Sequence, residues 1–375
     1  MSRAPLRLLH VFGAMDRGGA ELRTVEIMRH VDPALVIHEF ATLSGRAGSL
    51  APTIRELGGE VLPCRLDAGF APRFVSLLRA RKIDIVHSHV FLASGMILAL
   101  ALLAGVPRRI AHFRSTSDGQ TSTARRRLYR ASMRRLIDGA ATDILGVSAA
   151  SLDEGWSPRW ADDRRCRVIY NGVDPDRFAT ADGAGVRGEL GLPADARLVA
   201  QVGRFDPLKN HPFTATLMPH LPEAHVVFVG RGGTALEAET RRRIASVGAI
   251  DRAHFVGERD DVGRWLAAAD VSLLPSVIEG LPGAVLESLA VGTPVVASDL
   301  PGVRELAAQL DGVTALGLGA GPAVWAAALR SHLVAPSPPA ARAALRARLA
   351  ASPFTMRAAV DAYLEVWTGA RATAS

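Results

Sequence analysis

The segment LLPSVIEGLPGAVLE, residues Leu273–Glu287, carries two glutamates eight positions apart and is the strongest indicator of the fold. The apolar run ending at Leu274 predicts a buried strand. Pro282 fits the first position of a following helix, because proline lacks only an N–H that would be unpaired there. Glu279 is then expected in the strand-to-helix loop, and Glu287 about one turn into the helix. The free N–H groups of a helix start attract anions, so carboxylates beside them suit a ligand with phosphates and hydroxyls, such as a nucleotide sugar. The alternative is a chance pair of glutamates around a helix that starts at a proline.

Apolar runs alternate with amphipathic stretches along the whole chain, which predicts an α/β fold of parallel sheets covered by helices. With 375 residues the chain is long enough for two domains, and the small-residue segment 180–185 predicts the boundary between them. The expected domains are residues 1–179 and 186–350. The expected strands are Leu6–Phe12, Ile37–Thr42, Val61–Pro63, Ile83–His87, Arg109–Phe113, Ile144–Val147 and Arg167–Tyr170, then Arg197–Val202, His225–Val229, His254–Val256, Val271–Leu274, Pro294–Ala297 and Val313–Ala315.

The net charge of +7 is uneven, because residues 1–178 hold the whole basic excess. Its densest part is Arg125–Arg135, where basic and apolar residues alternate at helical spacing. This pattern favours either a helix on an anionic membrane surface or a solvated arginine-rich helix. Nucleic acid is not expected as a partner, since aromatic residues make up only 5% and no nucleic-acid motif is present. Two distant cysteines, Cys64 and Cys166, and the lack of a signal-peptide pattern lead us to expect a cytoplasmic protein, peripheral at the inner membrane face if the basic helix binds lipid.

In each half of the chain, a glycine-containing segment follows the first predicted strand. Gly18 and Gly19 follow the first strand of the chain, and there a glycine pair lets backbone amides approach phosphate oxygens. The segment is not G-x-G-x-x-G, which argues against a dehydrogenase. The segment GRFDPLKN, residues Gly203–Asn210, follows the first strand of the second series, where Arg204 and Lys209 offer two cations for a diphosphate. An exposed basic loop and a turn glycine pair are the alternatives.

Histidines close two predicted strands of the first half. His87 and His89 end one strand and His112 ends the next, at the sheet edge where ligands of open α/β sheets collect. A structural role is the alternative for each. His87 and His89 could begin a metal site, but no third and fourth ligand stands at metal-site spacing. Asp174-x-Asp176 is formally a metal-binding D-x-D, which we interpret as a turn, and no metal is therefore expected.

These motifs together resemble the family 4 retaining glycosyltransferases of the GT-B fold, in which two Rossmann-like domains face each other across a cleft. The carriers of the resemblance are the E-x7-E segment, GRFDPLKN and Gly18-Gly19-Ala20-Glu21. Smaller matches are Ile169–Phe178, Val229–Gly232 and Phe255–Val262. The resemblance covers nearly the whole chain and is strongest to bacterial enzymes of exopolysaccharide, capsule and lipopolysaccharide assembly. It also implies that a last helix, about residues 354–375, returns to the first domain.

The resemblance implies a role for each site residue, with no metal or other cofactor. Glu287 would bind the ribose hydroxyls, Arg204 and Lys209 the diphosphate, and Glu279 the donor hexose. His112 would lie near the anomeric carbon, with His89 as a neighbouring wall. The expected catalytic residues are thus His112, Arg204, Lys209 and Glu279; the further donor-binding residues are Gly18, Gly19, Gly230, Arg259, Gly280, Leu281, Pro282, Gly283 and Glu287.

The implied activity is transfer of a hexose or N-acetylhexosamine from a nucleotide sugar, with UDP favoured, to a glycan or lipid-linked glycan. Two other classes stay open. A GT-B epimerase or phosphorylase would share the fold and the phosphate site but carry its own catalytic groups. A non-catalytic relative would keep the fold as a partner protein.

Overall fold

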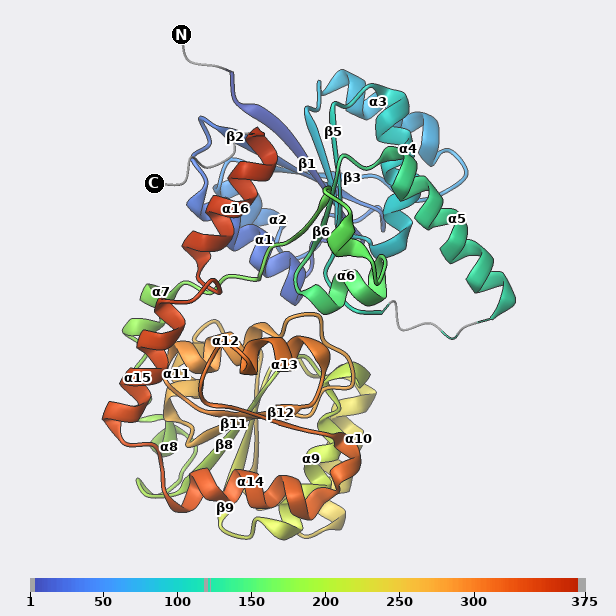
Figure 1. Ribbon diagram of the computed structural model, residues 1–375. Helices are drawn as coiled ribbons and strands as arrows, with labels where there is room; N and C mark the ends of the chain where they lie inside the picture. Colours follow the sequence, from blue (N-terminus) through green and yellow to red (C-terminus); the bar gives the residue numbers. More distant parts are fainter. Residues whose placement is uncertain (1–3, 118–120, 122, 370–375) are drawn as a thin grey trace. The chain divides into compact units, whose positions relative to one another are not determined.

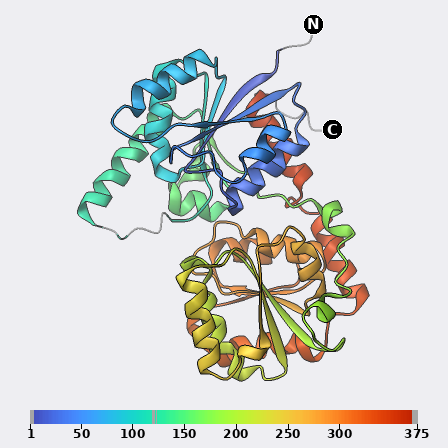
Figure 2. The ribbon, with the colours of Figure 1, turned by 180° about the vertical axis from the view of Figure 1, so that it is seen from behind.

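The computed structural model describes residues 4–117, 121 and 123–369. The chain divides into two compact units (Figures 1 and 2). The first unit ends at Asn171 and takes up the chain again from Met356, whereas the second unit is Gly172–Thr355. The chain thus passes from the first unit to the second a few residues before the small-residue segment 180–185. That segment connects short helices of the second unit instead of linking the two.

The first unit is built on a seven-stranded parallel sheet in the order β3-β2-β1-β4-β5-β6-β7. Its strands are β1 (Leu6–Phe12), β2 (Val36–Thr42), β3 (Glu60–Pro63), β4 (Ile85–Ser88), β5 (Arg108–Phe113), β6 (Asp143–Gly146) and β7 (Cys166–Val168). Its helices are α1 (Gly19–His30), α2 (Ala51–Glu56), α3 (Phe70–Ala80), α4 (Ser94–Ala104), α5 (Ala124–Ala140), α6 (Ala149–Gly155) and α16 (Met356–Thr368), with short 3-10 turns at Phe91–Ala93 and Trp160–Asp162.

The second unit is built on a six-stranded parallel sheet in the order β10-β9-β8-β11-β12-β13. Its strands are β8 (Arg197–Val202), β9 (Ala224–Val229), β10 (Ala253–Gly257), β11 (Val271–Leu274), β12 (Val295–Ser298) and β13 (Val313–Leu316). Its helices are α7 (Pro175–Ala179), α8 (Val186–Glu189), α9 (His211–Leu217), α10 (Ala235–Ser246), α11 (Val262–Ala268), α12 (Gly283–Ala290), α13 (Pro301–Ala307), α14 (Pro322–Val334) and α15 (Pro339–Ala350). The 3-10 turns are Pro207–Lys209, Met218–His220, Ile250–Arg252 and Leu318–Ala320.

All thirteen predicted strands are present, and the predicted α/β class with two Rossmann-like sheets is confirmed. In both sheets the first strand lies in the middle and the chain then builds outward in both directions. The neighbouring pairs β1–β4 and β8–β11 are therefore the points where the strand order reverses. Loops diverge at such a point and leave room for a ligand beyond the carboxyl ends of the strands.

The last helix, α16, packs on the sheet of the first unit (Figure 1). Alternate strand residues point to one face, and on this face Leu8, Ile85 and Ile110 pack against Val360 and Tyr363 of the helix. The opposite face, which includes Leu9 and Val86, is covered by α3, α4 and α5. The core of this unit therefore has two layers of helices around one sheet.

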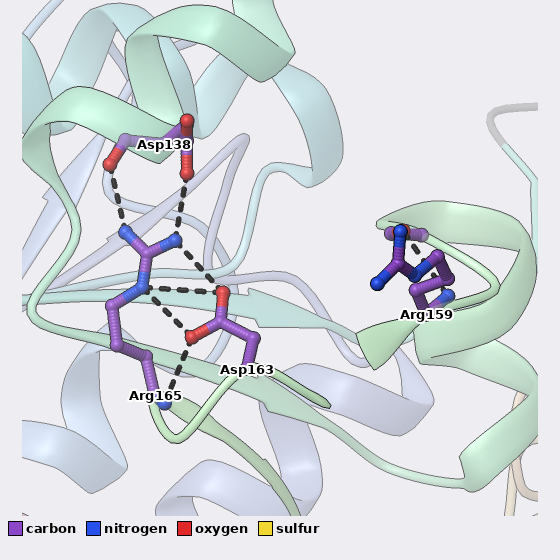
Figure 3. A network of polar contacts seen from close by, with 5 residues as sticks. Asp138, Arg159, Asp163 and Arg165 are labelled. Atoms are coloured by element: carbon purple, nitrogen blue, oxygen red, sulfur yellow. Dashed lines mark hydrogen bonds and ion pairs between the residues drawn. The ribbon is translucent and has the colours of Figure 1, made fainter. Parts of the chain in front are cut away.

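An arginine holds the end of α5 to the chain before β7 (Figure 3). The Arg165 guanidinium donates at 2.7 Å to both the backbone oxygen and a carboxylate oxygen of Asp138, and at 2.8 Å to Asp163. The hydrogen bond from Arg165 lowers the pKa of the Asp163 carboxyl below its ordinary value. The network fixes the end of the longest helix of this unit, which carries the arginine-rich segment.

Two details of the predicted motifs differ or gain a structural explanation. Pro282 is the N-cap residue of α12 rather than its first helical residue, so the helix starts one position later. Asp174 caps α7, and its carboxylate accepts a hydrogen bond from the Asp176 N–H at 3.0 Å. The D-x-D thus serves as a helix cap. Among the described residues, no helix is long and apolar enough to cross a bilayer.

Candidate active site

The predicted donor residues of the second unit lie at the carboxyl edge of its sheet, where β8 and β11 are neighbours. The loop after β8 carries Arg204 and Lys209, and the loop after β11 carries Glu279. A backbone hydrogen bond from Val277 N–H to the Leu208 oxygen, 2.8 Å long, ties the two loops together. The two loops that sequence reasoning selected separately therefore form one surface at the point where the strand order reverses.

Lys209 and Glu279 form an ion pair across these loops. Lys209 Nζ lies 2.6 Å from Glu279 Oε1, and the side chains are 27% and 12% exposed. Asn210, next to the lysine, has a left-handed backbone (φ 52°) that asparagine adopts more readily than most residues, and this turns the chain into α9. The carboxylate thus holds the ammonium group in place while leaving it partly accessible to a second anion.

Arg204 is more exposed than Lys209 and less tightly held. Its side chain is 46% exposed and lies 3.9 Å from a carboxylate oxygen of Asp206. Asp206 itself accepts a hydrogen bond from the Leu208 N–H at 2.9 Å, which shapes the turn between the two cations. A planar guanidinium with this freedom can present two N–H groups to one phosphate.

Glycines let the neighbouring loops approach one another closely. A Cβ atom on Gly230 would lie 2.0 Å from the Gly203 oxygen, so only glycine fits between the loops after β8 and β9. A Cβ atom on Gly302, at the start of α13, would lie 1.8 Å from the Gly280 oxygen. The Gly280–Gly283 segment, in which Leu281 and Pro282 are buried, is thereby packed directly against a neighbouring helix.

The remaining predicted donor residues of the second unit lie in different surroundings. Glu287 lies on α12 and is partly buried. Arg259 is engaged within its own region: it lies 2.9 Å from Asp261 and 3.8 Å from Glu189, with its guanidinium over the Trp265 ring. The described structure does not bring Arg259 to the Lys209–Glu279 pair.

In the first unit, Gly18 and Gly19 lie where β1 leads into α1. Gly18 is the N-cap of the helix, and a Cβ atom there would lie 2.3 Å from a carboxylate oxygen of Glu21, whereas at Gly19 it would meet nothing within 4 Å. His112 lies near the end of β5 and is buried. These three residues, like the donor loops of the other unit, belong to the carboxyl edge of their sheet.

A cluster of histidines surrounds His112, and of its members only His87, His89 and His112 were predicted from the sequence. His10, His38, His87 and His112 come from four neighbouring strands, and each follows by two positions a core residue on the α16 face. The four short motifs LLH, VIH, IVH and IAH carry this signal in the sequence. Burial is the first cause that lowers the pKa of His10, His87, His89 and His112 well below 6.5, so all four are neutral at pH 7.

Three of these histidines, His10, His87 and His89, place ring nitrogens within 4.8 Å of one another and could be considered as metal ligands. His10 supplies the third ligand that the sequence analysis did not find. Both nitrogens of His87 are already engaged, however, by Trp367 and by His112. In addition, the His87 and His89 rings are stacked at 4.2 Å, so their in-plane lone pairs do not converge on one point. The donor set therefore does not fit a metal ion without rearrangement.

The comparisons with known proteins agree with this architecture. The structure of HepE from Anabaena, solved with UDP, superposes on this chain with a TM-score of 0.80, covering 98% of this chain and 100% of that one at 18% identity. At this level of identity the likeness establishes the fold, which is GT-B.

The sequence comparisons define the family. Residues 17–177 match the model described as Glycosyltransferase Family 4, and residues 196–334 match Glycosyl transferases group 1. EpsF of Bacillus subtilis (strain 168), provisionally named as a glycosyltransferase, is 30% identical over 87% of each chain. The capsular polysaccharide biosynthesis glycosyltransferase CapH of Staphylococcus aureus is 28% identical over 76% of this chain and 78% of its own. The chain belongs to the family 4 glycosyltransferases, as its motifs indicated.

Proposed function

We propose that this glycosyltransferase moves a hexose or N-acetylhexosamine from a UDP-sugar to a glycan or polyprenyl-linked glycan of a cell-surface polysaccharide. The observation that carries the proposal is the Lys209–Glu279 pair at the reversal point of the second sheet, with Arg204 in the same loop. The complexes of HepE with UDP and with UDP-glucose, and the naming of CapH as an enzyme of capsular polysaccharide biosynthesis, support the choice of donor and product.

In this proposal the second unit holds the nucleotide sugar. Arg204 and Lys209 stabilise the charge that develops on the diphosphate as the bond to the anomeric carbon breaks. Glu279 keeps Lys209 in place and accepts hydrogen bonds from donor hydroxyls, while Glu287 binds the ribose. The acceptor hydroxyl attacks from the face that the diphosphate leaves, and its proton passes to the departing phosphate oxygen. This path retains the anomeric configuration and uses no enzymic nucleophile.

The test of the donor is a thermal-shift screen with UDP-, GDP-, ADP- and dTDP-sugars. We expect UDP-sugars to raise the Tm of the wild type, and Glu287→Ala to lose this response because the ribose loses its partner. Glu239→Ala is the matched control, since Glu239 lies on α10 of the same unit and pairs with Arg243 in its own helix. A wild type that responds to no nucleotide sugar would contradict the proposed function. An epimerase or phosphorylase would instead convert the donor without a glycan acceptor.

We also propose that the transfer needs no metal ion, because Arg204 and Lys209 of the loop after β8 would supply the positive charge at the diphosphate. We therefore expect UDP release to be unchanged by EDTA. Turnover that stops with EDTA and returns with Mg²⁺ would overturn this part of the proposal.

We further propose that α5 contacts anionic lipid. Arg125, Arg127 and Arg135 are exposed on it, and Leu128 is 70% exposed between them. Replacing the three arginines by glutamine should weaken co-sedimentation with vesicles of anionic lipid. The control is the same change at Arg241, Arg242 and Arg243 of α10, where Arg241 and Arg243 pair with glutamates. If both variants bind the vesicles equally well, α5 is a solvated helix and not a lipid-binding one.

A further inference from the structure

The histidine cluster of the first unit contains a hydrogen-bonded chain whose proton positions are fixed from one end. Trp367 Nε1 donates to His87 Nδ1 at 3.3 Å, and His87 Nε2 lies 3.1 Å from His112 Nδ1. All three side chains are buried. His112 Nε2, at the far end, is buried and has no hydrogen-bond partner within the described structure.

The tryptophan decides the direction of this chain. An indole N–H can only donate, so His87 Nδ1 must accept and carries no proton. A neutral His87 then has its proton on Nε2 and donates it to His112 Nδ1. A neutral His112 in turn has its proton on Nε2, where it meets no acceptor.

Among the described residues, the second series of hydrogen-bonded histidines includes no group that can only donate. His38 Nδ1 lies 3.1 Å from His10 Nε2, and His10 Nδ1 lies 3.1 Å from His89 Nε2. Every group in it can donate or accept, so its direction can reverse. In contrast, the hydrogen-bonded series that starts at Trp367 permits one set of proton positions when both of its histidines are neutral.

We propose that Trp367 is a positioning residue that, through His87, holds His112 as the Nε2–H tautomer, so that His112 serves the transfer as a hydrogen-bond donor. The inference rests on the proposed function for the reaction that His112 serves. A buried N–H without a partner is destabilising, so the Nε2–H of His112 is ready to donate to an acceptor oxygen. His112 therefore acts as a donor and not as a general base.

The tautomer is tested in the protein without ligand, by long-range ¹⁵N–¹H spectra of protein labelled in histidine, with the His112 signals assigned from His112→Gln. We expect His112 in the wild type with Nε2 protonated and Nδ1 unprotonated. In Trp367→Phe, which keeps an aromatic ring beside Tyr363 but removes the N–H, we expect a mixture of tautomers. Trp325→Phe is the matched control, because it removes a buried indole N–H bond, to the Gly317 oxygen, in the other unit.

A wild-type His112 protonated on Nδ1, or a tautomer unchanged in Trp367→Phe, would overturn the positioning role. Metal bound at the cluster would overturn it as well, because ligation of His87 would displace one of its two hydrogen bonds. None of these outcomes depends on the transferase activity, so they separate this inference from the proposed function.

The donor role of His112 is tested by turnover of the nucleotide sugar that stabilises the wild type in the screen. Glutamine can donate from the position of Nε2 but cannot act as a base. We therefore expect His112→Gln to keep UDP release within about fivefold of the wild type and His112→Ala to lose about 10-fold or more. Equal losses in both variants would contradict the donor role.

Discussion

In the proposed mechanism the Lys209–Glu279 ion pair has one role in the free protein and another when the donor is bound. In the free protein the pair is largely buried and neutralises itself. A diphosphate would share the ammonium group with Glu279, so the carboxylate is already in place to orient the lysine. Removing only one partner of such a pair leaves the other charge without compensation.

We predict that Lys209→Met lowers kcat/KM by about 10²-fold or more, because the diphosphate loses a cation and Glu279 is left unpaired. The measurement is UDP release at varied donor concentration. Lys82→Met is the control, since Lys82 is the other lysine of the chain and lies exposed in the first unit. Turnover by Lys209→Met close to that of the control would remove Lys209 from the site.

At the scale of the elements, α13 determines where the loop before α12 lies. Gly302→Ala would place a Cβ atom 1.8 Å from the Gly280 oxygen, and backbone cannot yield as a side chain does. We predict a loss of about 1–3 kcal/mol in the free energy of unfolding, as for other overpacked sites, together with a weaker Tm response to the donor. Gly188→Ala, in α8 with open space around it, should be neutral or stabilising. If Gly302→Ala changes neither the free energy of unfolding nor the Tm response to the donor, this contact does not position the loop.

The end of α5 should respond to pH through Arg165. The folded pKa of Asp163 lies below its ordinary 3.8, so this pairing stabilises the protein above about pH 4, and the contribution is lost as the pH falls through the folded value. We predict that Arg165→Gln costs about 0.5–1 kcal/mol at pH 7 and less at pH 3, measured by urea unfolding.

Arg159→Gln is the matched control for this prediction. Arg159 pairs with Asp162 in the same region (Figure 3), but the side chains are 86% and 69% exposed, so little change is expected at either pH. A cost for Arg165→Gln that does not depend on pH would contradict the electrostatic explanation.

At the scale of the whole molecule, the order of elements in the chain differs from their grouping in space. The chain completes the second unit and then returns α16 to the first, where it covers the sheet face that carries the histidines. The helix is therefore part of the core that positions His112, although the two are far apart in the sequence.

We predict that Val360→Asp, which places a charge in the α16 interface, speeds amide hydrogen exchange in β1, β2 and β4 but not in β8 or β11. Asp361→Ala, at an exposed position of the same helix, should leave exchange unchanged. Faster exchange spread evenly over both units would show that α16 does not belong to the first unit alone.

The order of the elements and the residue types of the predicted donor site can be read from local patterns in the sequence. Strands such as Val271–Leu274 are short apolar runs, and loops such as Gly203–Asn210 carry their glycines and cations in fixed spacing. Both are local patterns, so they can be detected without knowing which strands are neighbours.

Which of these residues contact one another could not be predicted without the three-dimensional fold. The ion pair of Lys209 with Glu279 spans 70 positions, and the bond from Trp367 to His87 spans 280. The ion pair of Arg259 with Glu189 likewise joins residues that are far apart in the sequence. Such contacts depend on strand order, register and the return path of the last helix. These features follow from the packing of the whole core and not from any local pattern.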